Sequence, residues 1–445
     1  MIDMSVGMIT LVITVSLLLL IVTGLPIAFC LFFLSVAGIL LWARPESLFL
    51  LASATYNQSL KDYFIALPTF IFMAAVLQVS GIGNGLYTMF YSWMGGLRGG
   101  LAMGTVGVST LLAAMTGSAS TATVGMGLIA YPEMRKRGYD KSMAIGCIPS
   151  GGCLGPLIPP SLPMIIVAAL SSISIGKLFI SGIFPGFLAA ACFILYIGIR
   201  CFIKPSLGPA LSVAERPGWR EKFISLRGVI APIILIILVL GMIYTGVTTP
   251  SEAGGIGAFG ALICTAIYGN FNLKNLKESM LIALKLTAMV LWMIIAGVCF
   301  SSLLSITLVN QFIADILIGM VANRWIILII MLFIVFVMGM FIDTTPITII
   351  TIPIFIPIVR ELGFDPLWFG LIFTMDLIIG FLTPPFGMSL FYFKGIGHPD
   401  VSMEDIYRAV LPFVALITLA WVLCIIFPQI ALWLPNQMIK PIGTG

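Results

Sequence analysis

Long apolar runs recur from one end of the chain to the other, and no other feature limits its fold as strongly. Many reach about 18 residues or more, the length that an α-helix needs to cross a hydrocarbon core of roughly 30 Å. Only 9% of the 445 residues are charged, against roughly 25% in a soluble domain, which excludes a water-soluble fold. The runs are about twice as long as the strands of a membrane barrel. The sequence therefore predicts an all-α polytopic membrane protein.

Residues suited to metal binding or catalysis are scarce. The eight cysteines lie in apolar runs without a pairing pattern, and the single histidine, His398, stands in a connecting segment. The sequence has no Gly-Lys-Ser/Thr phosphate loop and no Ser/His pair within an apolar run. We therefore expect no enzyme activity and no organic cofactor. The net charge of +5 comes largely from connecting segments, so it reports orientation in a lipid bilayer and indicates no nucleic-acid partner.

The chain contains an internal repeat with an offset of 225 residues. From residue 132 to residue 160 the match gives eight identities in 29 positions without a gap, where composition alone gives about two. This predicts a first repeat at 1–203, a linker at 204–227 and a second repeat at 228–445. The identical residues are Pro132, Arg135, Gly138, Asp140, Gly155, Leu157, Pro159 and Pro160, which match Pro357, Arg360, Gly363, Asp365, Gly380, Leu382, Pro384 and Pro385.

The charges of two equivalent loops indicate that the repeats are inverted. Loop 135–141 holds four Lys and Arg residues, whereas its counterpart keeps Arg360 and adds Glu361. Lys and Arg collect on the cytoplasmic side of membrane proteins. An inverted arrangement places both termini outside the cytoplasm and assigns 16 of the 22 Lys and Arg residues to the cytoplasmic side. The repeats are therefore expected to cross the membrane in opposite directions.

Each repeat has two interrupted apolar segments. Polar tips fall inside the runs 99–132 and 325–359, which predicts two re-entrant hairpins because lipid cannot satisfy an opened backbone. Pro-Pro pairs interrupt the runs at about 142–170 and 366–395, which predicts two broken helices. The polar tip and the Pro-Pro pair are 41 residues apart in both repeats, from Ser118 to Pro159 and from Asp343 to Pro384. A C-terminal helix follows the second broken helix.

Two shorter segments, 45–63 and 271–285, occupy equivalent positions in the repeats. The second is amphipathic, a pattern typical of a helix that lies in the membrane interface. We expect both to be arms, which either brace a scaffold while the hairpins move or lie passively on the interface. The charged residues of the second segment are Lys274, Lys277, Glu278 and Lys285.

The interruptions offer ligands for a cation and an anion. Unwound carbonyls, hydroxyls and a carboxylate are hard oxygen donors, and the N-terminus of a half-helix attracts an anion. The alternative is that the Pro-Pro pairs are only kinks and the small residues only allow close helix packing. The candidate Na⁺ ligands are Gly117, Ser118, Pro159, Gly339, Asp343, Thr344, Thr383 and Pro384. The candidate substrate-binding residues are Ser118, Ser120, Thr121, Ser161, Thr345 and Gly387.

Three acidic residues stand in or beside apolar runs. Asp343 at the second tip is the main candidate, because a carboxylate at this depth is expensive and usually functional, although Asp is also a good helix cap. Asp376 is either a ligand or a partner in an internal hydrogen bond. Glu252 follows Thr249 and Pro250, which favours a capping role in the first turn of a helix.

These motifs together resemble the large membrane subunit of tripartite ATP-independent periplasmic (TRAP) transporters, the DctM-like family of the ion transporter superfamily. The short motifs are weak singly, but they follow the family order over nearly the whole chain. They are Gly24-Leu25-Pro26, Ala66-Leu67-Pro68, Gly117-Ser118-Ala119-Ser120-Thr121, Gly138-Tyr139-Asp140, Ile158-Pro159-Pro160-Ser161, Ile175-Gly176-Lys177-Leu178-Phe179, Thr249-Pro250-Ser251-Glu252-Ala253, Gly339-Met340-Phe341-Ile342-Asp343, Leu382-Thr383-Pro384-Pro385 and Leu432-Trp433-Leu434-Pro435.

The resemblance implies an elevator-type transporter in a bacterial inner membrane, driven by a Na⁺ gradient. It also implies two partners, a small four-helix membrane subunit (DctQ-like) and a periplasmic protein that delivers an organic anion. The family usually has Asn where this chain has Asp376, and often an acidic residue in place of Ile378. The alternative is a stand-alone Na⁺-coupled carboxylate symporter or Na⁺/H⁺ antiporter of the same superfamily.

Overall fold

The chain folds into helices throughout the part that the structure, a computed structural model, describes: residues 4–212, 215–320 and 323–439. Helices make up 81% of it and these residues form no strand, which confirms the all-α prediction. Seven helices in these ranges are long and apolar enough to cross a membrane, or up to nine if each of two bent helix pairs is one span. The protein is therefore a multi-span helical membrane protein.

The helices of the first repeat run to Ile203. They are α1 (Val6–Val22), α2 (Ile27–Trp42), η1 (Pro45–Ser47), α3 (Leu48–Ser59), α4 (Tyr63–Val79), α5 (Ile82–Met94), α6 (Gly100–Thr116), α7 (Ala119–Lys136), α8 (Lys141–Cys153), η2 (Gly155–Leu157), α9 (Leu162–Ser171) and α10 (Ile175–Ile203). The expected linker 204–227 contains η3 (Pro205–Leu207) and α11 (Trp219–Leu226).

The helices of the second repeat follow the same plan. They are α12 (Ile230–Tyr244), α13 (Pro250–Ile267), α14 (Leu273–Ile306), α15 (Val309–Met320), α16 (Arg324–Phe341), α17 (Thr344–Glu361), α18 (Pro366–Leu382), α19 (Met388–Gly395), α20 (Met403–Ile426) and α21 (Gln429–Asn436). The offset of 225 residues carries Ala119–Lys136 onto Thr344–Glu361 at both ends of the helix. The repeat found in the sequence therefore extends to helix boundaries.

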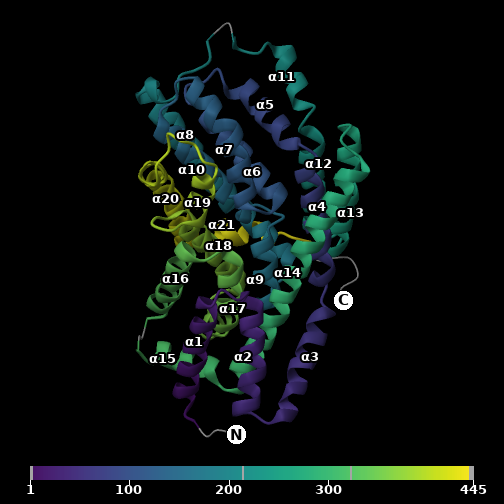
Figure 1. Ribbon diagram of the computed structural model, residues 1–445, viewed down its shortest axis with the longest axis vertical. Coiled ribbons are helices and arrows are strands. Elements are labelled where there is room, and N and C mark those ends of the chain that lie inside the picture. Colours follow the sequence, from purple (N-terminus) through teal and green to yellow (C-terminus); the bar gives the residue numbers. More distant parts are fainter. Residues whose placement is uncertain (1–3, 213–214, 321–322, 440–445) are drawn as a thin grey trace.

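The predicted hairpins are helix pairs that extend toward opposite ends of the molecule. In Figure 1, α6 and α7 occupy the upper half and α16 and α17 the lower half. The first pair turns at Gly117, whose φ of 63° lies in the left-handed region, where glycine has no steric penalty. The second pair turns at Asp343, which has extended backbone. This arrangement agrees with an inverted repeat.

Equivalent aspartates begin the two broken helices. The side chain of Asp140 accepts a hydrogen bond from the Met143 N–H at 3.1 Å, and Asp365 accepts one from the Leu367 N–H at 2.7 Å. Such caps satisfy N–H groups that have no partner within the helix. The Asp that the repeat preserves at these two positions thus starts both broken helices. Their first parts, α8 and α18, end near the Pro159-Pro160 and Pro384-Pro385 pairs.

Close helix contacts hold each hairpin against the broken helix of its own half. A Cβ on Gly155 would lie 2.2 Å from the Cβ of Ala113 in α6. At the equivalent place in the second half, a Cβ on Gly380 of α18 would lie 2.7 Å from the Phe336 carbonyl oxygen and 2.9 Å from the Gly339 Cα of α16. Small residues allow this approach of backbones, as at many helix interfaces in membranes.

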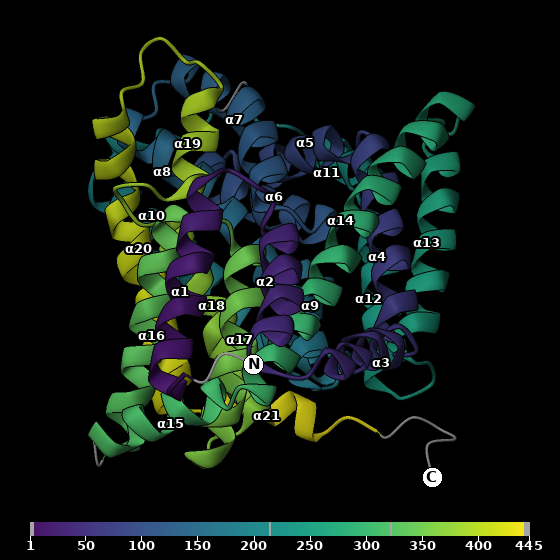
Figure 2. The same cartoon turned by 60° about the horizontal axis from the view of Figure 1, so that its bottom comes forward.

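The two segments expected as arms differ in shape. Segment 45–63 forms η1 and α3, and it meets α4 at a bend of 55°. Segment 271–285 is the first part of the continuous 34-residue α14. It is therefore not a separate helix, because no Gly or Pro follows Lys285 before Gly297. Figure 2 shows α3 and α15 on the side of the molecule that holds the N-terminus, and Figure 1 shows α11 at the opposite end.

Candidate functional site

A cavity of about 490 Å³ lies where the two hairpin tips meet. Its size is that of a pocket for a small molecule. The two tips, both broken helices and the helices α4 and α14 all contribute to the lining. The lining residues with polar or charged side chains are Gln78, Thr116, Ser118, Ser120, Thr121, Cys153, Lys285, Asp343, Thr344 and Thr345. Seven predicted site residues therefore line one space: Gly117, Ser118, Ser120, Thr121, Asp343, Thr344 and Thr345.

The first tip is a cluster of hydroxyls at the N-terminus of α7. The Ser118 Oγ accepts hydrogen bonds from the Thr121 N–H at 3.3 Å and the Thr121 hydroxyl at 3.2 Å. It also lies 2.9 Å from the Ser120 Oγ. Ser118 is thus the cap of α7, and the cluster surrounds a helix end with partial positive charge. Such a site suits an anion.

The second tip presents a carboxylate that does not cap its helix. Asp343 occupies the position before α17, yet its side chain accepts no hydrogen bond from a backbone N–H of that helix. The Thr344 hydroxyl donates to the Asp343 Oδ1 at 3.1 Å. The alternative that Asp343 is a side-chain cap is therefore not supported. Its exposed carboxylate is available to the cavity as a hard oxygen ligand.

Ser161 of the first broken helix lies beside the main cavity. It lines a small adjoining pocket together with Thr116, Gly117 and Leu162. Its hydroxyl donates to the Pro156 carbonyl oxygen and accepts from the Met164 N–H, so it caps α9. Pro159 does not line either pocket.

Four candidates of the second half lie away from the cavity lining: Gly339, Thr383, Pro384 and Gly387. The Thr383 hydroxyl donates to the Ile379 carbonyl oxygen at 2.6 Å, and the Thr383 carbonyl accepts from the Gly387 N–H at 3.0 Å. Gly339 packs against Gly380 at a helix crossing. In this conformation these residues have structural contacts, whereas the tips form the cavity.

The other two acidic candidates are placed differently from each other. Glu252 forms a capping box with Thr249, whose N–H donates to the Glu252 Oε2 at 2.8 Å, which confirms the capping role. Asp376 in α18 is 2% exposed, and its Oδ2 has no hydrogen-bond partner among the described residues. An internal hydrogen bond through that oxygen is therefore not found.

Comparison with known proteins decides the family. Residues 14–430 match the family described as tripartite ATP-independent periplasmic transporter, DctM component. The chain belongs to this family. The family consists of transporter permease subunits, which are not enzymes. The cavity between the tips is therefore the candidate transport site of a DctM-family permease.

Curated relatives extend over nearly the whole chain. The C4-dicarboxylate TRAP transporter large permease protein DctM of Pseudomonas aeruginosa is 31% identical over 406 residues, which cover 91% of this chain and 93% of that protein. The sialic acid TRAP transporter large permease protein SiaM of Vibrio cholerae is 28% identical and covers 93% of this chain, with 95% of its own length matched. The ectoine TRAP transporter large permease protein TeaC of Halomonas elongata is 31% identical over 83% of this chain and 85% of its own.

A solved structure shows the same fold. The YdaH transporter of Alcanivorax borkumensis superposes with a TM-score of 0.62 at 15% sequence identity, over 96% of this chain and 98% of that protein. At this identity the likeness supports the helical architecture of the DctM-family chain and nothing finer.

Lys285 and Gln78 are lining residues that the sequence analysis missed. Both lie outside the hairpins, Gln78 in α4 and Lys285 in α14. Lys285 was assigned to an amphipathic arm because three other charged residues precede it. Neither Lys285 nor Gln78 stands in a local motif, so the sequence carries no signal that sets them apart from other polar residues.

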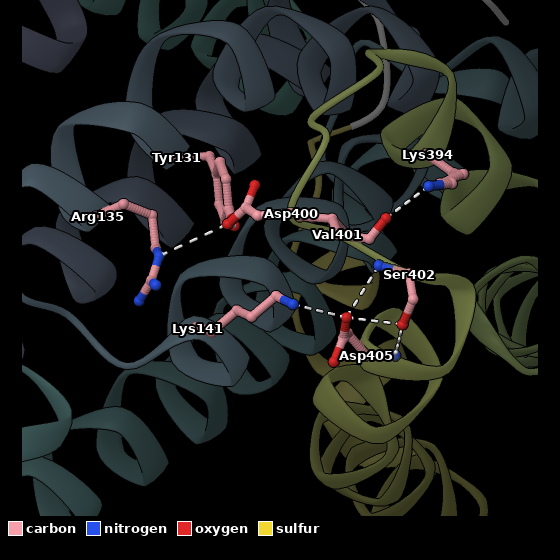
Figure 3. Close-up of polar contacts among 8 residues, drawn as sticks. All are labelled: Tyr131, Arg135, Lys141, Lys394, Asp400, Val401, Ser402 and Asp405. Carbon is pink, nitrogen blue, oxygen red and sulfur yellow. Dashed lines mark hydrogen bonds and ion pairs between the residues drawn. The ribbon is translucent and has the colours of Figure 1, made fainter.

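A polar cluster ties the end of α7 to the segment before α20 (Figure 3). The Tyr131 hydroxyl donates to the Asp400 Oδ2 at 2.6 Å, and the Arg135 Nε lies 3.9 Å from the same oxygen. The Lys141 ammonium group forms an ion pair with Asp405 at 2.7 Å. The hydrogen bond from Tyr131 lowers the pKa of the Asp400 carboxyl below its usual range. The cluster joins the far end of the first hairpin to the second half of the chain.

Proposed function

We propose that this DctM-family protein is the large subunit of a Na⁺-coupled transporter that imports a small organic anion across a bacterial inner membrane. A periplasmic binding protein delivers the anion, and a small four-helix membrane subunit forms a complex with the large subunit. The observation that carries the proposal is one cavity lined by both hairpin tips, with the hydroxyl cluster at the N-terminus of α7 on one side and the Asp343 carboxylate on the other.

The cation half of the proposal rests on Asp343. Its carboxylate lines the cavity without serving as a side-chain cap, and Thr344 places a hydroxyl next to it. Carboxylate and hydroxyl oxygens are ligands that an alkali cation prefers, and a bound Na⁺ offsets the negative charge. Asp343 would hold Na⁺ at the second tip, so that binding of the cation links the tip to the space where the substrate lies.

The anion half rests on the first tip. Ser118, Ser120 and Thr121 surround the N-terminus of α7, where oriented N–H groups and hydroxyl donors favour a carboxylate or sulfonate. The named substrates of the relatives, C4-dicarboxylates, sialic acid and ectoine, all carry at least one carboxylate. The substrate class is therefore a small organic anion such as a carboxylate, a sugar acid or a sulfonate.

Movement of the hairpins relative to α4 and α14 would carry the site across the membrane, as in an elevator. The site lies at the boundary between these elements, because its lining comes from the hairpin tips and broken helices on one side and from α4 and α14 on the other. The inverted repeat provides two hairpins that enter from opposite faces, with both termini on the periplasmic side. The positive-inside rule supports this orientation.

The test is uptake into proteoliposomes that contain the chain, its small subunit and the binding protein, with each cation gradient imposed separately. Asp343→Asn keeps the shape of the side chain but removes its charge, and no side-chain cap of α17 is lost. We expect this variant to assemble normally, yet to require at least about tenfold more Na⁺ for half-maximal uptake, the change that corresponds to about 1.4 kcal/mol of lost binding. The matched control Glu361→Gln, at the opposite end of α17, should behave as the wild type.

Two results would contradict the proposal. Unchanged Na⁺ dependence in Asp343→Asn would move the cation site elsewhere, for which Ser118 and Ser161 are the next candidates. Full uptake by the large subunit without its two partners would identify a stand-alone symporter or antiporter instead.

A further inference from the structure

Lys285 reaches the transport cavity from a helix that does not belong to a hairpin. It lies twelve residues after the start of α14, about 18 Å along the helix at 1.5 Å per residue. Ile282, Lys285 and Leu286 of α14 all line the cavity. Their spacing of three and four residues places them on one face of the helix. The lysine is therefore part of a helix face that borders the site, and is not an isolated side chain directed at lipid.

The ammonium group of Lys285 has no polar partner among the described residues. Within residues 4–212, 215–320 and 323–439 it forms no hydrogen bond and no ion pair, and its side chain is exposed. By contrast, Lys141 is paired with Asp405 at 2.7 Å, and Arg137 is paired with Glu133 at 2.7 Å. The side chain is thus positioned for a charged partner from outside the chain.

The charge balance of the cavity indicates what that partner is. Among its described lining residues, Lys285 and Asp343 are the charged ones. If Na⁺ neutralises Asp343, as the proposed function requires, the loaded cavity keeps one positive charge from Lys285. The first tip binds one anionic group through hydroxyls and a helix end, which leaves the lysine for a second anionic group.

We propose that Lys285 is a specificity-determining residue that binds a second anionic group of the substrate, so that the transporter selects dianions over matched monoanions. This inference rests on the proposed function and deepens it. The first acidic group lies at Ser118, Ser120 and Thr121, and the second lies at the α14 side of the cavity. Two apolar residues of α14 that flank Lys285 on the same helix face, Ile282 and Leu286, contact the carbon chain between the groups.

The test uses the complex of the large and small subunits, purified in detergent, and measures its thermal stabilisation by succinate and by succinamate. Succinamate has the same carbon chain but carries an amide in place of one carboxylate. With Na⁺ present, we expect succinate to bind about tenfold to a hundredfold more tightly than succinamate, which is the usual contribution of a hydrogen bond to a charged group. Lys285→Gln should abolish this preference without changing binding of succinamate, and Lys285→Arg should retain it.

The matched control is Lys277→Gln, which removes an exposed charge from the same helix two turns earlier and does not line the cavity. It should keep the wild-type preference, and size-exclusion profiles of all variants show whether they fold. Na⁺-dependent stabilisation that is equal for both ligands in the wild type would overturn the assignment of Lys285 and leave the proposed function standing. Stabilisation by succinate that does not respond to Na⁺ would contradict the proposed function while keeping the assignment. Absence of stabilisation by either ligand would overturn the dianion selectivity.

Discussion

Replacement of Gly380 by alanine tests how tightly the second hairpin is packed against its broken helix. A methyl group at this position would lie 2.7 Å from the Phe336 carbonyl oxygen and 2.9 Å from the Gly339 Cα, and both contacts are with backbone. Neither neighbour can rotate away as a flexible side chain does. The helices α16 and α18 must therefore move apart by about half an ångström or more to reach ordinary van der Waals separation, as in other cases of overpacking.

The expected magnitude follows from a comparison with two other glycines. Overpacking of a close interface typically costs about 1–3 kcal/mol, whereas Gly→Ala in a helix interior gains up to about 1 kcal/mol from helix propensity. Gly125→Ala in α7 is the matched control, because no atom lies within 4 Å of the added Cβ. Both variants gain the same helix propensity, so this gain cancels when their free energies of unfolding are compared. The free energy of unfolding of Gly380→Ala should therefore be about 1–3 kcal/mol lower than that of Gly125→Ala. Gly339→Ala, whose nearest contact is 3.2 Å, should fall between them.

The free energy of unfolding can be measured by SDS titration of the purified complex, with helical circular dichroism as the signal. The order of stability should be Gly125→Ala, then Gly339→Ala, then Gly380→Ala. Equal stability of Gly380→Ala and Gly125→Ala would show that the interface yields without cost, and the argument from close packing would be wrong.

Two further predictions concern topology and acid sensitivity. Lys136 and Glu361 occupy equivalent exposed positions in the two repeats. In a background without native cysteines, a membrane-impermeant thiol reagent should label Lys136→Cys from the cytoplasm and Glu361→Cys from the periplasm. Labelling of both variants from one side would contradict the inverted repeat. The hydrogen bond from Tyr131 lowers the pKa of Asp400. The ionised Asp400 carboxylate therefore stabilises the fold at neutral pH, and this stabilisation is lost as the pH falls through the lowered pKa. Asp400→Asn should therefore reduce thermal stability at pH 7 and lessen its decline on acidification, and an unchanged pH profile would rule out this contact as its source.

The repeat and the two tips could be predicted from the sequence because they depend on rare residues in fixed positions. Gly117 and Ser118 interrupt an apolar run, and Asp343 stands at the matching place in the second half, so local chemistry identifies both tips. The structure brings these residues together at one cavity. These residues form the turns of the two hairpins, so their spacing in the sequence is enough to predict where they lie in the fold.

The contribution of the scaffold helices could not be predicted in the same way. Gln78 and Lys285 line the cavity because of how α4 and α14 pack beside the tips, and this is a tertiary property without a local motif. Gly339 is predicted to be a Na⁺ ligand as part of an opened backbone, whereas in the structure it lies within α16 and packs against Gly380. The arm at 271–285 was expected to be separate because its charges resemble an interfacial helix, whereas the backbone continues through them in α14.

The bend between α3 and α4 is a difference in shape between the two halves of the repeat. Residues 48–79 are bent by 55° across the break at 60–62, whereas the equivalent residues 273–304 lie within one continuous helix. The halves thus share a sequence plan but hold two different shapes. The three residues of that break correspond to 285–287, so Lys285 stands at the position where the first half bends and the second half stays straight. The charge that lines the cavity therefore lies on a continuous helix, whose rigid backbone fixes its height relative to the two tips.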